Sequence, residues 1–95
     1  ANNGRAGVIA TLEDGSQVVR LSFVIDRLPP GGFIEVVLRA AGIAFLDGTT
    51  VKRFTADDLE ADGTLLVDIV RPADAGTSVC HTVHILAADG TPAGF

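Results

Sequence analysis

Residues 18–40 read VVRLSFVIDRLPPGGFIEVVLRA and carry the clearest pattern in the chain. Before the Pro-Pro-Gly-Gly break, apolar side chains occupy every second position from Val19 to Ile25. Arg20, Ser22 and Asp26 lie on the other face, where only Val18 and Val24 blur the alternation. After the break, the same alternation runs from Ile34 to Ala40. Because successive side chains of a strand point to opposite faces, this period of two predicts two half-buried β-strands.

Shorter alternating segments continue this pattern toward both ends of the chain. The further strands expected are Val8 to Leu12, 43–46, 50–54, 65–69, 78–87 and a stub at 91–95. Four Asp-Gly pairs separate strands, at 14–15, 47–48, 62–63 and 89–90, and glycine adopts the positive φ of tight turns at little cost. About seven or eight short strands, with turn signals roughly every ten residues, predict an all-β sandwich or small barrel.

The length and composition fit one globular domain over residues 1–95. A chain of 95 residues, 47% of them hydrophobic, forms a single core. The alternation predicts that this core is shared by Leu21, Phe23, Ile25, Val36, Leu38 and Val67. One helical turn is expected from Thr55 to Leu59, because a capping threonine precedes an acidic residue by three positions.

The balance of charge argues against nucleic acid as a partner. Twelve acidic and seven basic side chains give a formal net charge of −5, which repels phosphate backbones. The apolar runs are far shorter than the ~20 residues of a membrane helix, so no membrane insertion is expected. Cys80 is the single cysteine, so no intrachain disulfide is expected. That fits a reducing cytosol, and equally a bacterial surface or virus particle built without disulfides.

Residues 65–80 read LLVDIVRPADAGTSVC, and their spacing resembles the E-to-F region of immunoglobulin domains of the intermediate, cell-adhesion type. The matching residues are Leu65, Val67, Val70, Asp74, Gly76, Ser78 and Cys80. Ser78 stands where that family has its corner tyrosine, Phe23 stands where it has the partner cysteine, and the chain has no tryptophan. The resemblance implies a two-sheet antiparallel immunoglobulin-like β-sandwich of about seven strands.

A second, weaker resemblance covers Val19 to Gly42. Residues 28–32 form a Leu-Pro-Pro-Gly-Gly step between two alternating strands, which is similar to the opening of calcium-binding Calx-β modules. The acidic residues that those modules use to hold calcium are not found at matching positions. Both families are sandwiches, so this resemblance implies the same fold class.

The strand expected at 78–87 has two registers, which differ in the side chains that face the core. The inward sets are Cys80, Thr82, His84 and Leu86 for the immunoglobulin resemblance, and Val79, His81, Val83 and Ile85 for hydrophobic alternation. A slip of one residue exchanges the two faces. We expect the first register, because the spacing upstream of Cys80 agrees with the resemblance and burying a thiol costs little.

Cys80, His81 and His84 are residue types that bind zinc or copper. On a strand, however, Cys80 and His81 point to opposite faces, and Cys80 and His84 lie about 13 Å apart along one face. The same geometry keeps either histidine from acting as a base toward the thiol. We therefore expect no metal or other cofactor here, and no catalytic residue.

Asp57, Asp58, Glu60 and Asp62 form the densest acidic cluster. From Asp58 the spacing imitates the first half of an EF-hand loop, but the twelfth position is Ile69 where a bidentate glutamate is required. A looser calcium site made by this loop and a neighbouring one needs only oxygen ligands. A calcium- or glycan-binding module that uses the 57–62 loop is therefore the alternative function.

The end of the chain predicts an exposed sheet edge. Only Thr91 to Phe95 remain for a last strand, fewer than the about seven residues that an immunoglobulin-like domain uses there. An edge left open at this point is a place where another chain can add a strand. A shortened last strand is the simpler alternative.

The sequence carries no nucleophile elbow, phosphate loop or dinucleotide fingerprint, so we do not expect an enzyme. We expect a non-catalytic structural or attachment module of a bacterial surface protein or virus particle, with an extracellular, cell-surface or virion location. Its expected partner is another protein or a cell-surface ligand. Because fold alone does not fix function, this expectation rests partly on elimination.

Overall fold

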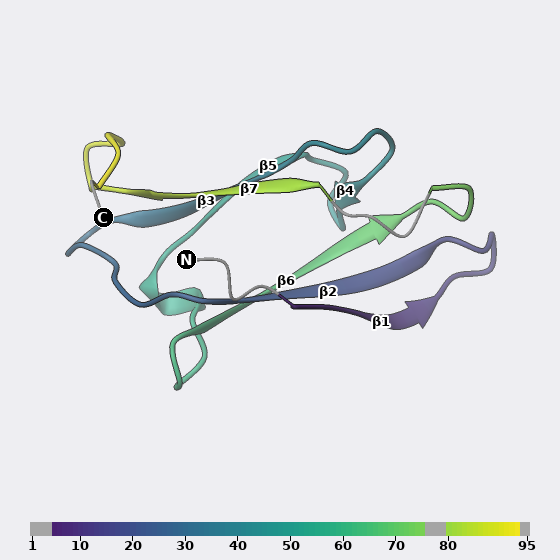
Figure 1. Cartoon of the computed structure of the whole chain (residues 1–95), viewed down its shortest axis with the longest axis horizontal. Helices are drawn as coiled ribbons and strands as arrows, with labels where there is room; N and C mark the ends of the chain where they lie inside the picture. The colour runs from purple at the N-terminus through teal and green to yellow at the C-terminus, as the bar shows by residue number, and fades with distance from the viewer. Residues whose placement is uncertain (1–4, 76–79, 94–95) are drawn as a thin grey trace.

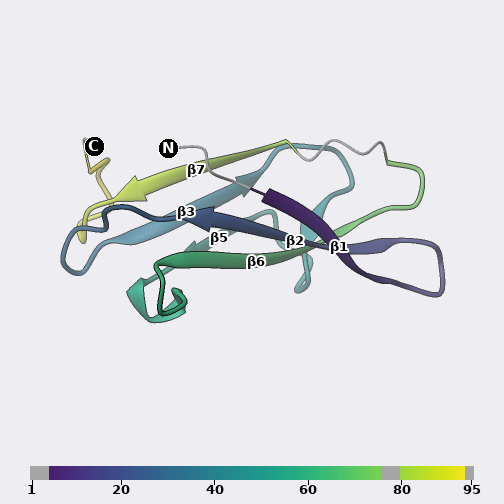
Figure 2. The ribbon, with the colours of Figure 1, turned by 60° about the horizontal axis from the view of Figure 1, so that its bottom comes forward.

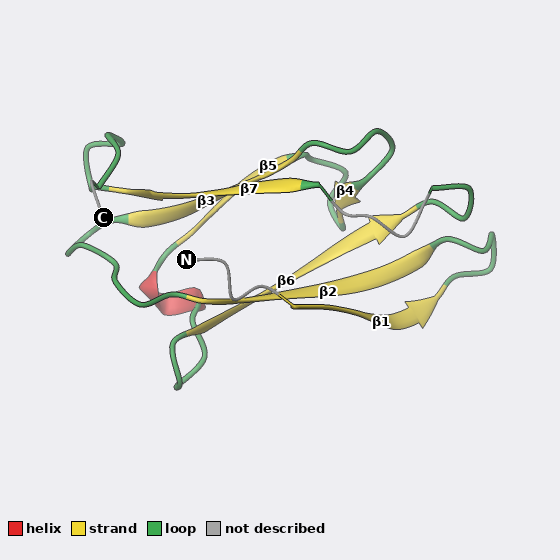
Figure 3. Ribbon diagram, in the orientation of Figure 1, coloured by secondary structure: helices red, strands yellow, loops and turns green. Residues whose placement is uncertain are grey.

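The computed structural model describes residues 5–75 and 80–93, which form an all-β sandwich (Figure 1). Its strands are β1 (Arg5–Thr11), β2 (Gln17–Val24), β3 (Phe33–Leu38), β4 (Ala44–Phe45), β5 (Val51–Phe54), β6 (Thr64–Arg71) and β7 (His81–Leu86). A short 3-10 helix, η1 (Ala56–Asp58), lies between β5 and β6 (Figure 3). No helix in the described part of the chain has the length and apolar character needed to cross a membrane.

The seven described strands form two antiparallel sheets that face each other (Figures 1 and 2). Sheet A has the order β1-β2-β6-β4, and sheet B has the order β5-β3-β7. The predicted all-β two-sheet antiparallel sandwich is thereby confirmed. Both sheets are held by partners distant in sequence, since β2 pairs with β6 from Gln17↔Arg71 to Val24↔Thr64, and β3 pairs with β7.

The core lies between the sheets and is filled by aliphatic side chains and phenylalanine, as the composition requires. Its buried members are Val19, Leu21, Phe23, Ile34, Val36, Leu38, Ile43, Phe45, Leu65, Val67 and Ile69. Burying each such side chain fully contributes about 1.5–3 kcal/mol. Five of the six predicted core residues are buried, and the sixth, Ile25, is half-buried and packs against the cluster.

Two ring contacts define which strands face each other across the core. The ring of Phe23 on β2 meets that of His81 on β7 edge to face, with centroids 5.2 Å apart. The rings of Phe45 on β4 and Phe54 on β5 meet in the same way at 6.5 Å. Strand β2 therefore lies opposite β7, and β4 lies opposite β5. Because β1 lies beside β2 at the other edge of sheet A, it faces the position next to β7, where sheet B has no further strand among those described.

The four predicted Asp-Gly turns are one structure used four times, at residues 12–16, 45–49, 60–64 and 87–91. In each five-residue turn, the N–H of the first residue donates to the carbonyl of the fifth residue at 2.7–2.8 Å. The glycine N–H donates to the carbonyl of the first residue at 2.9–3.0 Å. The glycines have φ between 85° and 88°. Each aspartate accepts a hydrogen bond from the fifth residue's N–H at 2.9–3.0 Å. Such three-residue loops fit the twist of a hairpin.

Those hydrogen bonds also set the acidity of the turn aspartates. Hydrogen bonds from the Ser or Thr that follows each Asp-Gly pair lower the pKa of the aspartate below its ordinary value of 3.8. The residues concerned are Asp14, Asp47, Asp62 and Asp89. The turn after β7 lies at one end of the sandwich, and the β1–β2 turn lies at the other (Figure 3).

Candidate functional site

Strand β7 has the register that hydrophobic alternation favours, so the expected register with Cys80 in the core is wrong. His81, Val83 and Ile85 lie opposite residues of β3 that are buried, namely Leu38, Val36 and Ile34. Paired residues of an antiparallel ladder share a face, so these three side chains point into the sandwich. Cys80 is exposed. This register turns the aliphatic side chains of Val83 and Ile85 toward the core and leaves the thiol outside, while Leu86, the apolar residue of the opposite set, is buried nonetheless.

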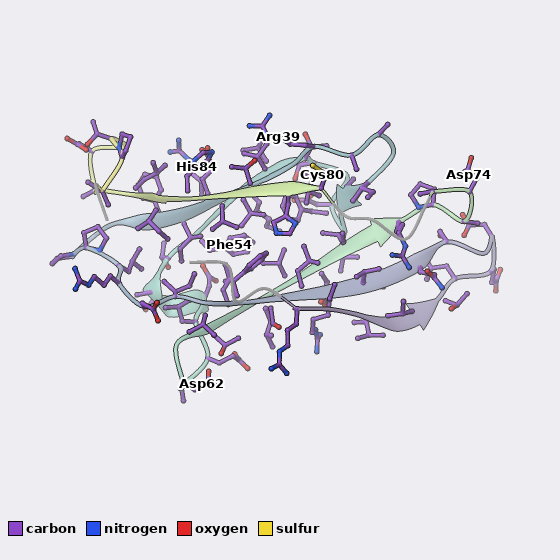
Figure 4. All side chains as sticks on the ribbon, in the orientation of Figure 1. Arg39, Phe54, Asp62, Asp74, Cys80 and His84 are labelled. Carbon is purple, nitrogen blue, oxygen red and sulfur yellow. The ribbon has the colours of Figure 1, made fainter. Side chains whose placement is uncertain are left out.

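The one-residue difference from the expected register is seen at the position where the immunoglobulin resemblance pairs Phe23 with Cys80. His81 takes that place, and its ring packs against Phe23. Its Nδ1 atom is buried and has no hydrogen-bond partner among the residues that the structure describes. Figure 4 shows Cys80 and His84 on the opposite side of β7, facing away from sheet A. On that outer face the Arg39 guanidinium donates to the Thr82 hydroxyl at 2.8 Å.

The candidate metal ligands are not brought together. Cys80 and His84 lie on the outer face of sheet B, whereas His81 points into the core. Within residues 5–75 and 80–93, no group of three or more His, Cys, Asp and Glu side chains is placed to hold a metal ion.

The carboxylates of the acidic loop lie on η1 and the turn that follows it, where two of them, those of Asp58 and Asp62, accept hydrogen bonds from local backbone. Asp58 accepts a hydrogen bond from the Thr55 N–H at 2.8 Å, and the Thr55 hydroxyl accepts one from the Asp57 N–H at 3.3 Å. This capping box confirms the predicted helical turn. Asp62 accepts from the Thr64 N–H at 3.0 Å, and it lies on the opposite side of the sandwich from β7 (Figure 4). All four acidic residues of the 57–62 loop are exposed.

The edges of the two sheets differ in how they are protected against pairing with another chain. Strand β1 carries a register shift between Val8 and Ala10, and β4 is only two residues long. Strand β5 carries Lys52 and Arg53. Bulges, very short strands and basic side chains are the devices that block added strands. Strand β7 reads HTVHIL and has none of them. Its free edge is the one unprotected edge among the described strands.

Part of the β7 edge is already paired by the chain's own return. The N–H of Ala93 donates to the carbonyl of Ile85 at 3.0 Å, and Pro92 lies opposite Leu86 in an antiparallel bridge. Ile85 therefore directs its backbone groups away from β3, whereas Cys80 directs its carbonyl toward Arg39, the residue that follows β3. Backbone direction alternates along an antiparallel strand, so His81 and Val83 also point to the free side.

The backbone N–H and C=O groups of His81 and Val83 are the hydrogen-bonding groups that this edge offers to another strand. None of the residues described in the structure donates to or accepts from them on the free side. The predicted edge near Thr91 to Phe95 is thus located beside β7, while Gly94 and Phe95 themselves lie outside the described residues.

No protein-family model, no curated protein and no solved structure matches the chain. The fold and its edges therefore define the protein by class, as an all-β two-sheet sandwich with one unprotected edge strand in its described part.

Proposed function

We propose that this chain is a non-catalytic structural or attachment module that binds another polypeptide by adding a strand to the free edge of β7. The observation that carries the proposal is the contrast between this edge and the others, which a bulge, shortness or basic side chains protect. Main-chain hydrogen bonds supply affinity in this mode, and pockets for alternate side chains supply specificity.

The apolar side chains around the edge support the same function. Val83 and Ile85 point inward yet stay only half-buried. On the other sheet, Val8 of β1 pairs with the buried Val19 of β2 and so shares its inward face, yet it is 50% exposed. A strand added beside β7 covers these groups, and apolar area removed from water contributes about 25 cal/mol per Å².

We also propose an immunoglobulin-like arrangement, which the strand order supports. Strands β1, β2 and β6 correspond to A, B and E of that fold, and β3 and β7 correspond to C and F. Its G strand pairs with F, at the place of the free edge of β7. The short strands differ, since β4 lies beside β6 but precedes β5 in the chain.

The proposed setting is the surface of a bacterium or of a virus particle, where such modules bind proteins or cell-surface ligands. The net charge of −5 supports a protein partner over nucleic acid. The alternative calcium-binding function has less support, because Asp58 and Asp62 already accept backbone hydrogen bonds.

The test compares two proline variants on opposite edges of sheet B. Val83→Pro removes an N–H that faces the free side of β7 and leaves the β3–β7 hydrogen bonds intact. Val51→Pro is the matched control on β5: Thr50 directs its carbonyl to Leu38, so the next residue faces solvent. Random dodecapeptides displayed on phage are selected on the domain, and their dissociation constants are measured by fluorescence anisotropy.

Selected peptides are expected to bind the domain and Val51→Pro alike, and to bind Val83→Pro about tenfold more weakly, the effect of roughly one hydrogen bond. Thermal unfolding of each variant checks that it is folded. Equal binding to both variants, or no selected peptide at all, would contradict the proposal.

A further inference from the structure

We infer that the partner of the free edge is a strand of another protein, which runs antiparallel to β7 and carries bulky apolar side chains at alternate positions. This inference rests on the function proposed above and adds the direction, chemistry and source of the bound strand. Three features of the described residues carry it: the direction of the chain's own return, the strand that faces the vacant position, and the composition around the edge.

The direction follows from the ladder that the chain begins. The bridge between Leu86 and Pro92 is antiparallel, and the Ala93 N–H continues it to the carbonyl of Ile85. A strand that extends this line toward His81 keeps the same hydrogen-bonding geometry. Antiparallel pairing is also slightly more stable per residue than parallel pairing.

The chemistry follows from what lies opposite the vacant position. Since β2 faces β7 across the core, β1 faces the place beyond β7. The inner residues of β1 are Ala6 and Val8, which pair with the buried Leu21 and Val19 and are themselves exposed. Because Ala6 leaves space, the incoming strand needs bulky apolar side chains on its inner face. Polar residues suit its other face, beside Thr82 and His84.

The source follows from composition and charge. In the described part of the chain's own return, residues 91–93, Pro92 cannot donate a main-chain hydrogen bond, so this segment is poorly suited to occupy the position itself. A second copy is disfavoured because each carries a net charge of −5. Among residues 5–75 and 80–93, the ladder of residues 91–93 also leaves only the His81 end of β7 without a partner for a mutual pairing. A neutral or basic strand of a different protein meets neither obstacle.

The exposed thiol of Cys80, at one end of β7, reports the direction of a bound strand. The probe is the nonapeptide Lys-Thr-Val-Thr-Phe-Thr-Ile-Thr-Lys, made with an additional cysteine at either its C-terminus or its N-terminus. That cysteine is activated as a mixed disulfide with thionitrobenzoate. The thiolate of Cys80 attacks the peptide sulfur, a new disulfide forms, and the released thionitrobenzoate anion is measured by absorbance.

Antiparallel binding brings the C-terminus of the peptide to Cys80, so the C-terminal probe is expected to react at least tenfold faster than the N-terminal one. Replacing its three apolar residues with threonine should remove that advantage. The comparison of the two probes uses the unmodified domain. As an additional control, the Val83→Pro variant is expected to react with the C-terminal probe at the slow rate of the threonine peptide.

The other outcomes separate the two proposals. Faster reaction of the N-terminal probe, or equal rates that both exceed those with Val83→Pro, would overturn the antiparallel direction and leave strand addition standing. Rates equal to those of the threonine peptide for both probes would overturn strand addition itself. A concentration-dependent dimer in analytical ultracentrifugation that Val83→Pro abolishes would overturn the assignment to another protein and favour a second copy.

Discussion

His81 places a polar ring on the inner face of the sandwich. Its imidazole lies on the inner face of β7, where the edge-to-face contact with Phe23 contributes about 0.5–1.5 kcal/mol. Against this, a buried polar atom without a hydrogen bond costs about 1–3 kcal/mol, and Nδ1 has no partner among the described residues. An apolar side chain of similar volume would keep the packing and remove this cost.

We therefore expect His81→Leu to raise the free energy of unfolding by about 1 kcal/mol. Urea denaturation at pH 7 measures it. His84→Leu is the matched control: that side chain is exposed on the outer face, so its replacement should change stability by less than about 0.5 kcal/mol. A loss of stability in His81→Leu would show that the imidazole contributes more than its unpaired nitrogen costs.

The sequence predicts most inward residues of this sandwich because alternation is a local property. On β2 it identifies Leu21 and Phe23 correctly, since a polar residue separates them. On β7 a threonine, a histidine and a leucine share the outer face and another histidine points inward, so polarity hardly distinguishes the faces. There the expected register rests on the spacing of a family resemblance, and it is wrong by one residue.

At the scale of the elements, the turns show how backbone conformation constrains the sequence. Gly48 has φ 85°, and a Cβ atom built there meets nothing within 4 Å, so conformation alone selects glycine. Gly7 on β1 has equally open surroundings and no positive φ. The two glycines differ in backbone conformation and hardly in space.

This difference predicts opposite effects of the same substitution. Gly48→Ala should lower the free energy of unfolding by about 1–2 kcal/mol, because an L-residue is strained in the left-handed region. Gly7→Ala should leave it unchanged or raise it by about 0.4–1 kcal/mol, because the unfolded chain loses freedom. Chemical denaturation of both variants makes the comparison, and equal effects would contradict it.

The turns were predictable because an Asp-Gly pair acts within five residues, and so was the capped turn at Thr55. The places of β4 and β5 were not. Each is short, and the chain crosses from β3 to sheet A for two residues before it returns to pair with β3. No local pattern encodes that crossing, because it depends on which edge remains vacant once the longer strands have paired.

At the scale of the whole molecule, the four turns link stability to acidity. Each of their aspartates has a folded pKa below the ordinary 3.8, because of hydrogen bonds from the following Ser or Thr. A lowered folded pKa means that the unfolded chain binds protons first as the pH falls. The stabilisation is therefore complete well above pH 4 and is lost progressively below about pH 4, as the pH falls through the folded pKa values.

We expect the free energy of unfolding to fall between about pH 4 and pH 2, and to fall less in the variant with all four turn aspartates replaced by asparagine. Asparagine keeps an acceptor for the backbone N–H and does not titrate. Urea denaturation at pH 5, 4, 3 and 2 measures the two slopes. An identical decline in both proteins would assign the acid sensitivity to other carboxylates.

The pairing of strands that are distant in the chain also implies an order of folding. The turns act within five residues, and β-hairpins form in microseconds. Arg20 and Asp68, which pair across β2 and β6, are 48 positions apart. Such ladders form only after a long loop has closed, which costs conformational entropy. This cost places folding in the millisecond-to-second range typical of sandwiches. During synthesis, β3 and β5 leave the ribosome well before β7. Until β7 joins them, sheet B is only a two-stranded ribbon, too small to be stable by itself. The strand whose edge we propose as the binding site is therefore also the strand whose late arrival closes the core.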